Sequence, residues 1–287
     1  MLNPQITPMA PGLYLIATPI GTARDITLRA LDILASADVL VAEDTRSLRK
    51  LMDIHGVHLR DRPVLSYHDH NGGHMRPRLM ALLNEGKSVA YASEAGTPLV
   101  ADPGFDLARA AREEGHTVVS APGASAVITA LTVGGLPTDR FFFNGFLPNA
   151  SGQRKSALRE LKDVPGTLVF YESPKRIASM LRDAAEVLGP NRDAAVCREL
   201  TKKFEEVLRA PLAELAVLCE ERALKGEIVV LIDRAGSPEI NKDDLETLIQ
   251  QALQNGSVRD AADMVAAQTG LPRRQVYQLA LKMDKDR

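Results

Sequence analysis

The chain has 287 residues, of which 45% are hydrophobic, and its formal net charge is −2. This length suits two ordinary domains or one large one, and the near-neutral charge means that only a local basic patch could meet a nucleic acid. No apolar run approaches the ~20 residues of a membrane helix, and the first residues lack the basic start and apolar core of a signal peptide. We therefore expect a cytoplasmic protein with no membrane contact.

The first part of the chain alternates strand and helix patterns. Strands are expected at Gly12–Ala17, Val39–Ala42, Val64–Tyr67, Val89–Ala92 and Thr117–Ser120. Helices are expected at Leu28–Ser36, Arg46–His55, Arg76–Asn84, Phe105–Glu114 and Ala124–Val133. This alternation predicts a mainly parallel sheet with helices on its faces.

Leu136–Asp139 is expected to link this part to a second one, in which fewer helices separate the strands. The strands are expected at Phe141–Phe146, Thr167–Tyr171, Ala194–Arg198, Glu205–Arg209 and Glu227–Asp233. The helices are expected at Arg154–Lys162, Lys175–Leu188 and Pro211–Glu221. This pattern predicts a mixed sheet.

Ala235–Pro238 has the composition of a second linker, and the rest of the chain is expected to be helical. Helices at Leu245–Gln254, Val258–Thr269 and Pro272–Lys282 include a helix, glycine turn, helix unit around Gly270. Such a unit resembles a helix-turn-helix, whose second helix can lie against nucleic acid. A small packing domain or dimer arm is the alternative that we favour slightly. The predicted domains are residues 1–136, 137–236 and 237–287.

The stretch SEAGTPLVADPG, residues 93–104, follows an expected buried strand and leads into a helix. Such strand-to-helix loops bind ligands in open α/β sheets, and a glycine such as Gly96 lets the backbone approach a ligand closely. The loop is therefore either a cofactor cradle or a tight connection without a ligand. The glycine turns of the chain include no G-x-G-x-x-G, Walker or G-x-S-x-G motif, which argues against a nicotinamide dinucleotide site and an α/β-hydrolase.

Glu43, Asp44, Thr45 and Arg46 follow another expected strand. A carboxylate in this position could orient or deprotonate a hydroxyl group. Asp44 or Thr45 could equally cap the following helix, and the motif alone favours the cap.

His68-Asp69-His70, with His74 nearby, superficially resembles a metal cluster. No carboxylate at a recognised spacing accompanies it, so ligand or RNA contact, or turn formation, is favoured over metal binding. Cys197 and Cys219 stand far apart without a C-x-x-C motif and are expected to be buried thiols. No metal site is expected.

Lys and Arg are concentrated between Gln153 and Lys203. This basic cluster could hold phosphates or form a solvated helix face. Within it, Arg198 and Glu199 could form an ordinary ion pair.

A family becomes visible when the motifs are taken in order. They are TPIG (18–21), AEDTR (42–46), HDHN (68–71), SEAGTPLVADPG (93–104), PGASA (122–126), LPTDRF (136–141), GFLP (145–148), FYESPKR (170–176), RELTK (198–202) and KGEIVVLI (225–232). Together they resemble the ribosomal small-subunit RNA cytidine 2′-O-methyltransferase family, which has the tetrapyrrole methylase fold. The resemblance runs from about Gly12 to Asp233, and the helical tail fits it.

The resemblance implies two α/β domains with a cofactor cleft between them, followed by the helical tail. It also implies a homodimer that uses S-adenosylmethionine to methylate a ribose 2′-hydroxyl on a decoding-region cytidine of 16S ribosomal RNA. The cofactor residues that it implies are Gly96, Thr97, Pro98, Ser125, Ala126, Tyr171, Glu172, Gly226, Glu227 and Ile228. The substrate side would include Pro19, Gly21, Arg198 and Lys202.

For the reaction, Asp44 or Glu43 is the candidate base, and Arg46 is the candidate for placing RNA. The chain departs from the family at Glu94, where Asp is common, and at Gly72-Gly73, where a Glu is common after HDHN. The second departure removes a carboxylate and weakens a catalytic role for HDHN.

Three other functions remain open on the residues alone. A C-methyltransferase acting on a tetrapyrrole would share the fold, and its carboxylate-bearing substrate would also favour cations. A nucleic-acid-binding protein could act through the terminal helix pair. A nucleotide hydrolase could use the Gly96 loop, but the paired metal-binding carboxylates that it would need are missing from the sequence pattern.

Overall fold

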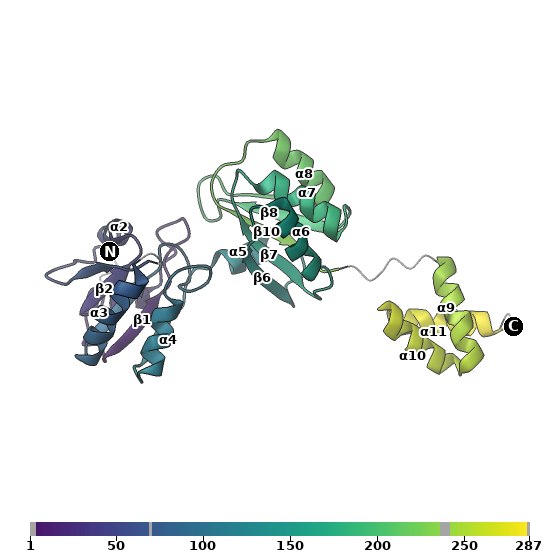
Figure 1. The fold of residues 1–287 in the computed structure, drawn as a ribbon, viewed down its shortest axis with the longest axis horizontal. Coiled ribbons are helices and arrows are strands. Elements are labelled where there is room, and N and C mark those ends of the chain that lie inside the picture. Colours follow the sequence, from purple (N-terminus) through teal and green to yellow (C-terminus); the bar gives the residue numbers. More distant parts are fainter. Residues whose placement is uncertain (1–3, 69–70, 236–241, 286–287) are drawn as a thin grey trace.

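The computed structural model describes residues 4–68, 71–235 and 242–285, which form two α/β units and a helical unit (Figure 1). Each α/β unit is built on a five-stranded sheet. The helical unit follows at the C-terminal end of the chain.

The first sheet is parallel throughout, with the strand order β3-β2-β4-β1-β5. Its strands are β1 (Gly12–Ile16), β2 (Val39–Ala42), β3 (Val64–Ser66), β4 (Ser88–Ala92) and β5 (Val118–Ala121). The helices are α1 (Leu28–Ser36), α2 (Thr45–Ile54), α3 (Gly72–Asn84), α4 (Phe105–Glu113) and α5 (Ala126–Val133). Because parallel strands end at one edge, the loops after β1, β2, β4 and β5 meet there.

Alternate side chains of these strands form two separate apolar cores. Ile16 and Ala92 belong to the core with α1 and α2, whereas Leu13 and Tyr91 belong to the core with α3 and α4. The two pairs of helices therefore cover opposite faces of the sheet.

Helix α3 begins at Gly72 and not at Arg76, where the sequence analysis started it. The glycines made a loop the better prediction, because glycine is a poor helix former. Asn71 overrides that preference. Its side chain accepts a hydrogen bond from the His68 N–H at 2.9 Å, and its carbonyl accepts from the N–H groups of His74 and Met75. The turn held by Asn71 therefore lets the helix begin at Gly72.

The second sheet has the order β6-β7-β10-β8-β9 and is mixed, as expected. Its strands are β6 (Phe141–Phe146), β7 (Thr167–Glu172), β8 (Asp193–Arg198), β9 (Glu206–Pro211) and β10 (Ile228–Ile232). Only β6 and β7 pair in parallel among these described strands. Helices α6 (Ser151–Glu160), α7 (Ile177–Leu188) and α8 (Leu212–Glu221) cover one face.

Helix α5 covers the other face of the second sheet, although it follows β5 of the first (Figure 1). Val127 and Leu131 of α5 share an apolar core with Val229 and Leu231 of β10. At Gly134 the helix end is so close that an added Cβ would lie 2.3 Å from Leu231 Cδ1. The division at residue 136 stays a prediction, but the helix just before it belongs to the core of the second sheet.

The helical unit comprises α9 (Lys242–Asn255), α10 (Val258–Thr269) and α11 (Arg273–Lys285). Ile249, Val265 and Val276 are buried in its own core. A capping box formed by Ser257 and Asp260 starts α10, and Gly270, with φ +69°, ends it. Of the predicted linker Ala235–Pro238, residues 236–238 lie outside the described residues.

None of the helices in the described ranges combines the length and apolarity that a membrane crossing requires.

The contact of Gly134 with β10 generates a stability prediction. Gly134→Ala would place a methyl group 2.3 Å from Leu231 Cδ1 and 3.0 Å from the Ala130 carbonyl, so the buried Leu231 side chain would have to shift, and we expect a loss of about 1–3 kcal/mol in unfolding free energy. Gly152→Ala in α6 is the control, because nothing lies within 4 Å of the added Cβ, and it should be neutral or stabilising. Urea unfolding measures both, and equal stability of the two variants would contradict the close packing.

Candidate functional site

Two loops at the carboxyl edge of the first sheet are tied into one rigid element. They are residues 18–21 after β1 and residues 93–98 after β4, which are neighbouring strands. Thr18 and Gly96 exchange two backbone hydrogen bonds of 3.0 Å, and the Thr18 hydroxyl donates to the Ser93 carbonyl at 3.1 Å. We call this joined pair of loops the crosspiece.

Gly96 of the crosspiece leaves little room for a side chain. Its φ of +80° suits glycine, and an added Cβ would lie 3.2 Å from Ile20 Cγ2 and 3.6 Å from the Ala124 carbonyl. The Thr97 hydroxyl donates to that same Ala124 carbonyl at 3.0 Å. The loop after β5, which carries Ser125, is therefore held against the crosspiece.

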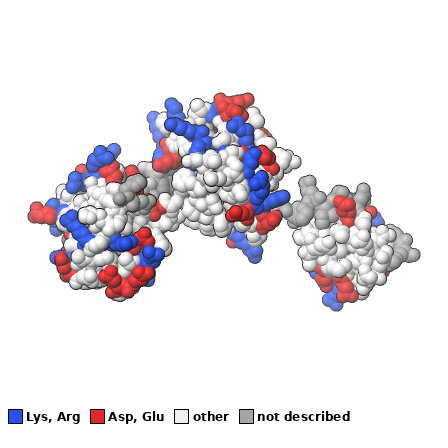
Figure 2. Space-filling model, in the orientation of Figure 1, with Lys and Arg blue, Asp and Glu red and all other residues white. Residues whose placement is uncertain are grey.

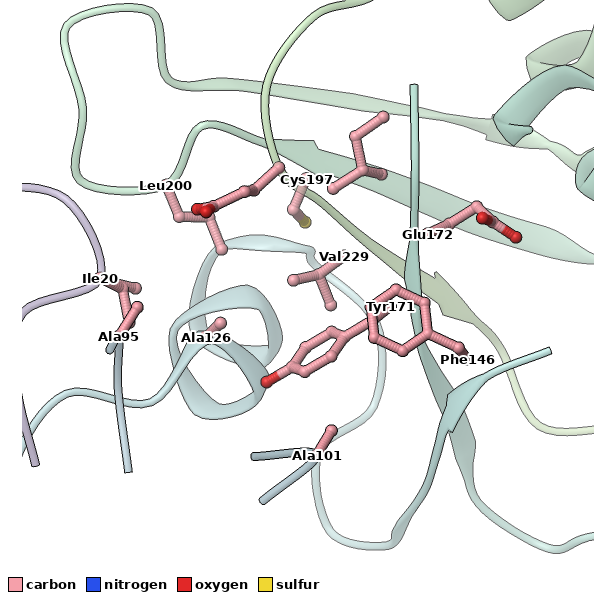
Figure 3. Close-up of a pocket in the computed structure, with 12 residues that line it drawn as sticks. Ile20, Ala95, Ala101, Ala126, Phe146, Tyr171, Glu172, Cys197, Leu200 and Val229 are labelled. Atoms are coloured by element: carbon pink, nitrogen blue, oxygen red, sulfur yellow. The ribbon is translucent and has the colours of Figure 1, made fainter. Parts of the chain in front are cut away.

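A cavity of about 260 Å³ lies between the crosspiece, α5 and the second sheet (Figure 3). We call it the first cavity. Its lining residues are Ile20, Ala95, Ala101, Ala126, Phe146, Tyr171, Glu172, Cys197, Leu200, Glu227, Ile228 and Val229. The rings of Phe146 and Tyr171 stand next to each other along one side, with centroids 5.6 Å apart. The cavity thus has an apolar wall with an aromatic pair.

The charged residues among the described lining are both acidic, Glu172 and Glu227. Glu227 Oε2 accepts from Lys202 Nζ at 2.8 Å. Burial raises the pKa of Glu172, and it outweighs the Arg176 guanidinium 3.2 Å from Oε2. Figure 3 shows the Glu172 side chain turned away from Tyr171. A cavity with apolar walls and acidic lining favours a cationic ligand with an apolar body.

The hydroxyl group of Tyr171 stays protonated in this setting. Burial raises the pKa of Tyr171, and the charges of Asp102 and Glu227 raise it further. Tyr171 therefore presents an aromatic face together with a neutral O–H group.

A second cavity, of about 190 Å³, lies on the other side of the crosspiece. Its lining residues are Thr18, Pro19, Gly21, Ala23, Ala42, Asp44, Ser47, Leu48, Lys50, Leu51, Ile54, Ser93 and Glu94. Neighbouring residues of one loop face different cavities, since Glu94 lines the second and Ala95 the first. Pro19 and Gly21 likewise line the second, whereas Ile20 lines the first. The two cavities therefore adjoin at the crosspiece.

Asp44 is both the N-cap of α2 and a wall of the second cavity. Its carboxylate accepts hydrogen bonds from the Arg46 backbone N–H at 2.8 Å and from Arg46 Nη2 at 2.9 Å. These bonds lower the pKa of Asp44 to about 2. The carboxylate is therefore ionised at any ordinary pH. Glu43 is not part of the described lining, whereas Glu94, which our site prediction omitted, is.

The ten predicted cofactor residues divide into two groups. Those that line the first cavity are Ala126, Tyr171, Glu172, Glu227 and Ile228. The others, which lie outside its lining, are Gly96, Thr97, Pro98, Ser125 and Gly226. The prediction missed Ile20, Ala95, Ala101, Phe146, Cys197, Leu200 and Val229. Most of these are apolar, and a sequence pattern does not separate an apolar cavity wall from an ordinary core.

The predicted substrate residues of the second unit are held in ion pairs. Arg198 lies 3.3 Å from Glu206 Oε2 and donates to the Lys225 carbonyl at 3.0 Å, so it does form an ion pair, but with Glu206 of β9 and not with Glu199, which pairs with Lys202. Lys202 bridges Glu199 and Glu227 at 2.9 and 2.8 Å.

Much of the predicted basic cluster is engaged in the same way. Arg154 is buried against Asp183 at 2.6 Å, and Lys155 bonds Glu186 at 2.6 Å. Arg176 approaches Glu172. These three side chains already pair with carboxylates. They therefore do not form the solvated face or the phosphate site that the sequence suggested.

The structure describes only part of the His68 motif. Asp69 and His70 lie outside the described residues, and the described ranges hold no group of three or more metal-ligating side chains. Cys197 and Cys219 are free and buried, as expected. Burial raises the pKa of Cys197 to about 12.

Comparisons with known proteins agree with this geometry. Residues 12–216 match the family described as Tetrapyrrole (Corrin/Porphyrin) Methylases, and residues 239–284 match the RsmI C-terminal HTH domain. The second match agrees with the helix-turn-helix resemblance of the tail.

Two solved structures share the fold. One is a conserved hypothetical protein from Aeropyrum pernix K1, with a TM-score of 0.61 and 20% identity over 97% of this chain and 98% of that one. The other is uroporphyrin-III C-methyl transferase from Thermus thermophilus complexed with S-adenyl homocysteine, with a TM-score of 0.55 and 19% identity over 78% and 98%.

Curated relatives are much closer in sequence. The protein named ribosomal RNA small subunit methyltransferase I in Mesorhizobium japonicum is 45% identical over 96% of this chain and 93% of its own length. The protein of that name in Escherichia coli O157:H7 is 41% identical over 94% of each chain. The chain therefore belongs to the tetrapyrrole methylase family, among the proteins named ribosomal RNA small subunit methyltransferase I.

Proposed function

We propose that this protein transfers the methyl group of S-adenosylmethionine to the ribose 2′-hydroxyl of a decoding-region cytidine in 16S ribosomal RNA. The observation that carries the proposal is the pair of cavities that adjoin at the crosspiece. One suits a cationic donor and the other a polar acceptor. The relatives of 45% and 41% identity, both named ribosomal RNA small subunit methyltransferase I, support the RNA substrate.

The first cavity fits the donor. S-adenosylmethionine supplies a methyl group activated by a positively charged sulfur, together with a flat adenine ring. Glu227 adds a carboxyl group to the lining, and Tyr171 with Phe146 offers aromatic surface. Ile20 and Leu200 add apolar surface to the wall. The Thermus enzyme of the same fold, complexed with S-adenyl homocysteine, supports this choice.

The second cavity fits the ribose. A 2′-hydroxyl is a poor nucleophile until its proton is shared with a nearby acceptor. Asp44 supplies an ionised carboxylate in this wall, and Glu94 of the crosspiece is a second acidic residue in the lining. A carboxylate whose pKa is about 2 is a weak base, so its main contribution would be to orient the hydroxyl. Arg46, bound to Asp44 and largely exposed, would contact RNA.

The substrate and assembly complete the proposal. The protein would act in the cytoplasm as a homodimer on the small ribosomal subunit. Methylation of a tetrapyrrole carbon is the second candidate, and the shared fold with uroporphyrin-III C-methyl transferase supports it. The rRNA relatives favour the first candidate because they are more than twice as similar in sequence.

The proposal as a whole has a direct test. Calorimetric titration of S-adenosylmethionine into the protein should show binding, and small subunits that lack the methyl group should then accept it at a ribose. Binding of S-adenosylmethionine without methyl transfer to RNA would rule out the RNA substrate, and tetrapyrroles would be tested as substrates next. Absence of binding would overturn methyl transfer altogether.

Gly96 gives a second prediction. Gly96→Val would press a branched side chain into Ile20 at a φ that valine resists, so we expect S-adenosylmethionine affinity to fall more than tenfold, as measured by calorimetry. Gly115→Val is the matched control: Gly115 has φ +82° and nothing lies within 4 Å of its added Cβ. It carries the same backbone strain away from the site and should bind normally. Normal binding by both variants would contradict the crosspiece as part of the donor site.

Asp44 is the subject of a third prediction. Asp44→Asn keeps a good N-cap but removes the negative charge, so we expect kcat to fall about 100-fold while S-adenosylmethionine affinity is unchanged. Asp53→Asn, at an exposed position of the same helix, is the control and should leave kcat unchanged. Because the pKa of Asp44 is about 2, it should add no acidic limb to the pH profile of kcat. A wild-type kcat in Asp44→Asn would remove Asp44 from the mechanism.

A further inference from the structure

The loop between β8 and β9, residues 199–205, is held in one conformation by its own hydrogen bonds. The Thr201 N–H donates to Glu205 Oε2 at 2.5 Å, and the Lys202 N–H donates to the Glu199 carbonyl at 2.9 Å. Glu199 and Thr201 have φ values of +51° and +64°, which non-glycine residues rarely adopt. Such conformations persist only where the surroundings fix them. The loop is therefore a preformed element.

This loop lines the first cavity and packs against a residue that lines the second. Leu200 lines the first cavity. The Thr22 N–H donates to the Thr201 hydroxyl at 3.1 Å, and an added Cβ on Gly21, which lines the second cavity, would lie 2.5 Å from Lys202 Cγ. The loop is thus packed against Gly21 of the crosspiece and hydrogen-bonded to Thr22, the residue that follows it.

Phe204 projects from this loop into solvent. It is 63% exposed, whereas Leu200 of the same loop is 6% exposed. The ammonium group of Lys203 lies 5.5 Å from the centre of the Phe204 ring. An aromatic ring with a cation beside it, held out by a preformed loop, offers a base-stacking surface next to a phosphate-binding charge.

Further cations lie on α2, at the other wall of the second cavity. Lys50 lines that cavity, and Arg46 and Arg49 are exposed on the same helix. Figure 2 shows Lys and Arg side chains gathered over the part of the first unit where Figure 1 places α2. Cations on α2 therefore border the second cavity, and Lys203 follows Lys202, whose side chain packs against Gly21 of the same cavity.

We infer that Phe204 is a stacking platform for an unpaired base that neighbours the methylated nucleotide, with Lys203 and the α2 cations holding the adjoining phosphates. The inference rests on the proposed function, because it takes the second cavity as the site of the target ribose. It assigns a single-stranded RNA segment to a surface on the body of the enzyme, apart from the terminal helices. Stacking accepts any base, so sequence choice would come from the target pocket.

The test is the rate of methyl transfer to unmethylated small subunits by Phe204→Ala, Phe204→Leu and Phe204→Trp. Loss of one stacked base corresponds to about a 5- to 150-fold loss of affinity, so KM for the subunit should rise by that factor in the Ala and Leu variants. Phe204→Trp keeps an aromatic face and should keep KM. S-adenosylmethionine affinity should stay constant throughout. Lys203→Ala should lower the salt dependence of RNA binding by about 0.7 in log–log slope.

Phe105→Ala is the matched control. Phe105 begins α4, is 62% exposed, and has Arg109 at 5.6 Å from its ring centre, so it copies the local setting of Phe204 elsewhere on the surface. Its loss should not change KM.

The outcomes separate this inference from the proposed function. Wild-type KM in an active Phe204→Ala enzyme would overturn the stacking platform and leave methyl transfer standing. A wild-type protein without methyl transfer would overturn both. A lower oligomeric mass of Phe204→Ala with unchanged RNA affinity would assign the ring to contact between copies of the chain, and would also overturn the inference.

Discussion

The packing of α5 against the second sheet is the contact on which the rest of the structure depends. The helix follows the first sheet in the chain, yet Val127 and Leu131 are buried against β10 of the second. The close approach at Gly134 leaves no space for a sliding motion. Because of this shared core, Ala126 at the start of α5 and Tyr171 of β7 face one cavity. Any rearrangement of the two sheets would have to break an apolar core.

The crosspiece, formed by the loops after two neighbouring strands, separates the two cavities. Its backbone bonds between Thr18 and Gly96 leave successive side chains facing opposite ways, so two chemically different cavities share one thin wall. The first is apolar with acidic groups, and the second contains hydroxyls and carboxylates. Preorganised positioning of this kind can supply much of the acceleration of a direct transfer between two bound groups.

Much of the fold could be predicted from the sequence, because alternating strand and helix patterns determine a parallel sheet and place its loops at one edge. Helix α1 and strand β2 have the expected bounds. The start of α3 could not be predicted, since it depends on bonds made by the Asn71 side chain. Of the residues that line the first cavity, motif order pointed to Tyr171 and Glu227 but not to Cys197 or Leu200, which look like ordinary core residues in sequence. The ion pairing of Arg154 depends on Asp183, twenty-nine residues away, and local pattern does not reveal such a partner.

Cys197 has a consequence for the chemistry of the first cavity. A thiolate is a strong nucleophile, and one facing a sulfonium methyl donor would compete with any intended acceptor. The β8 position buries this sulfur and raises the pKa of Cys197 to about 12, so the thiol stays protonated at neutral pH. In the proposed donor site, burial therefore keeps this small, polarisable side chain from competing for the methyl group.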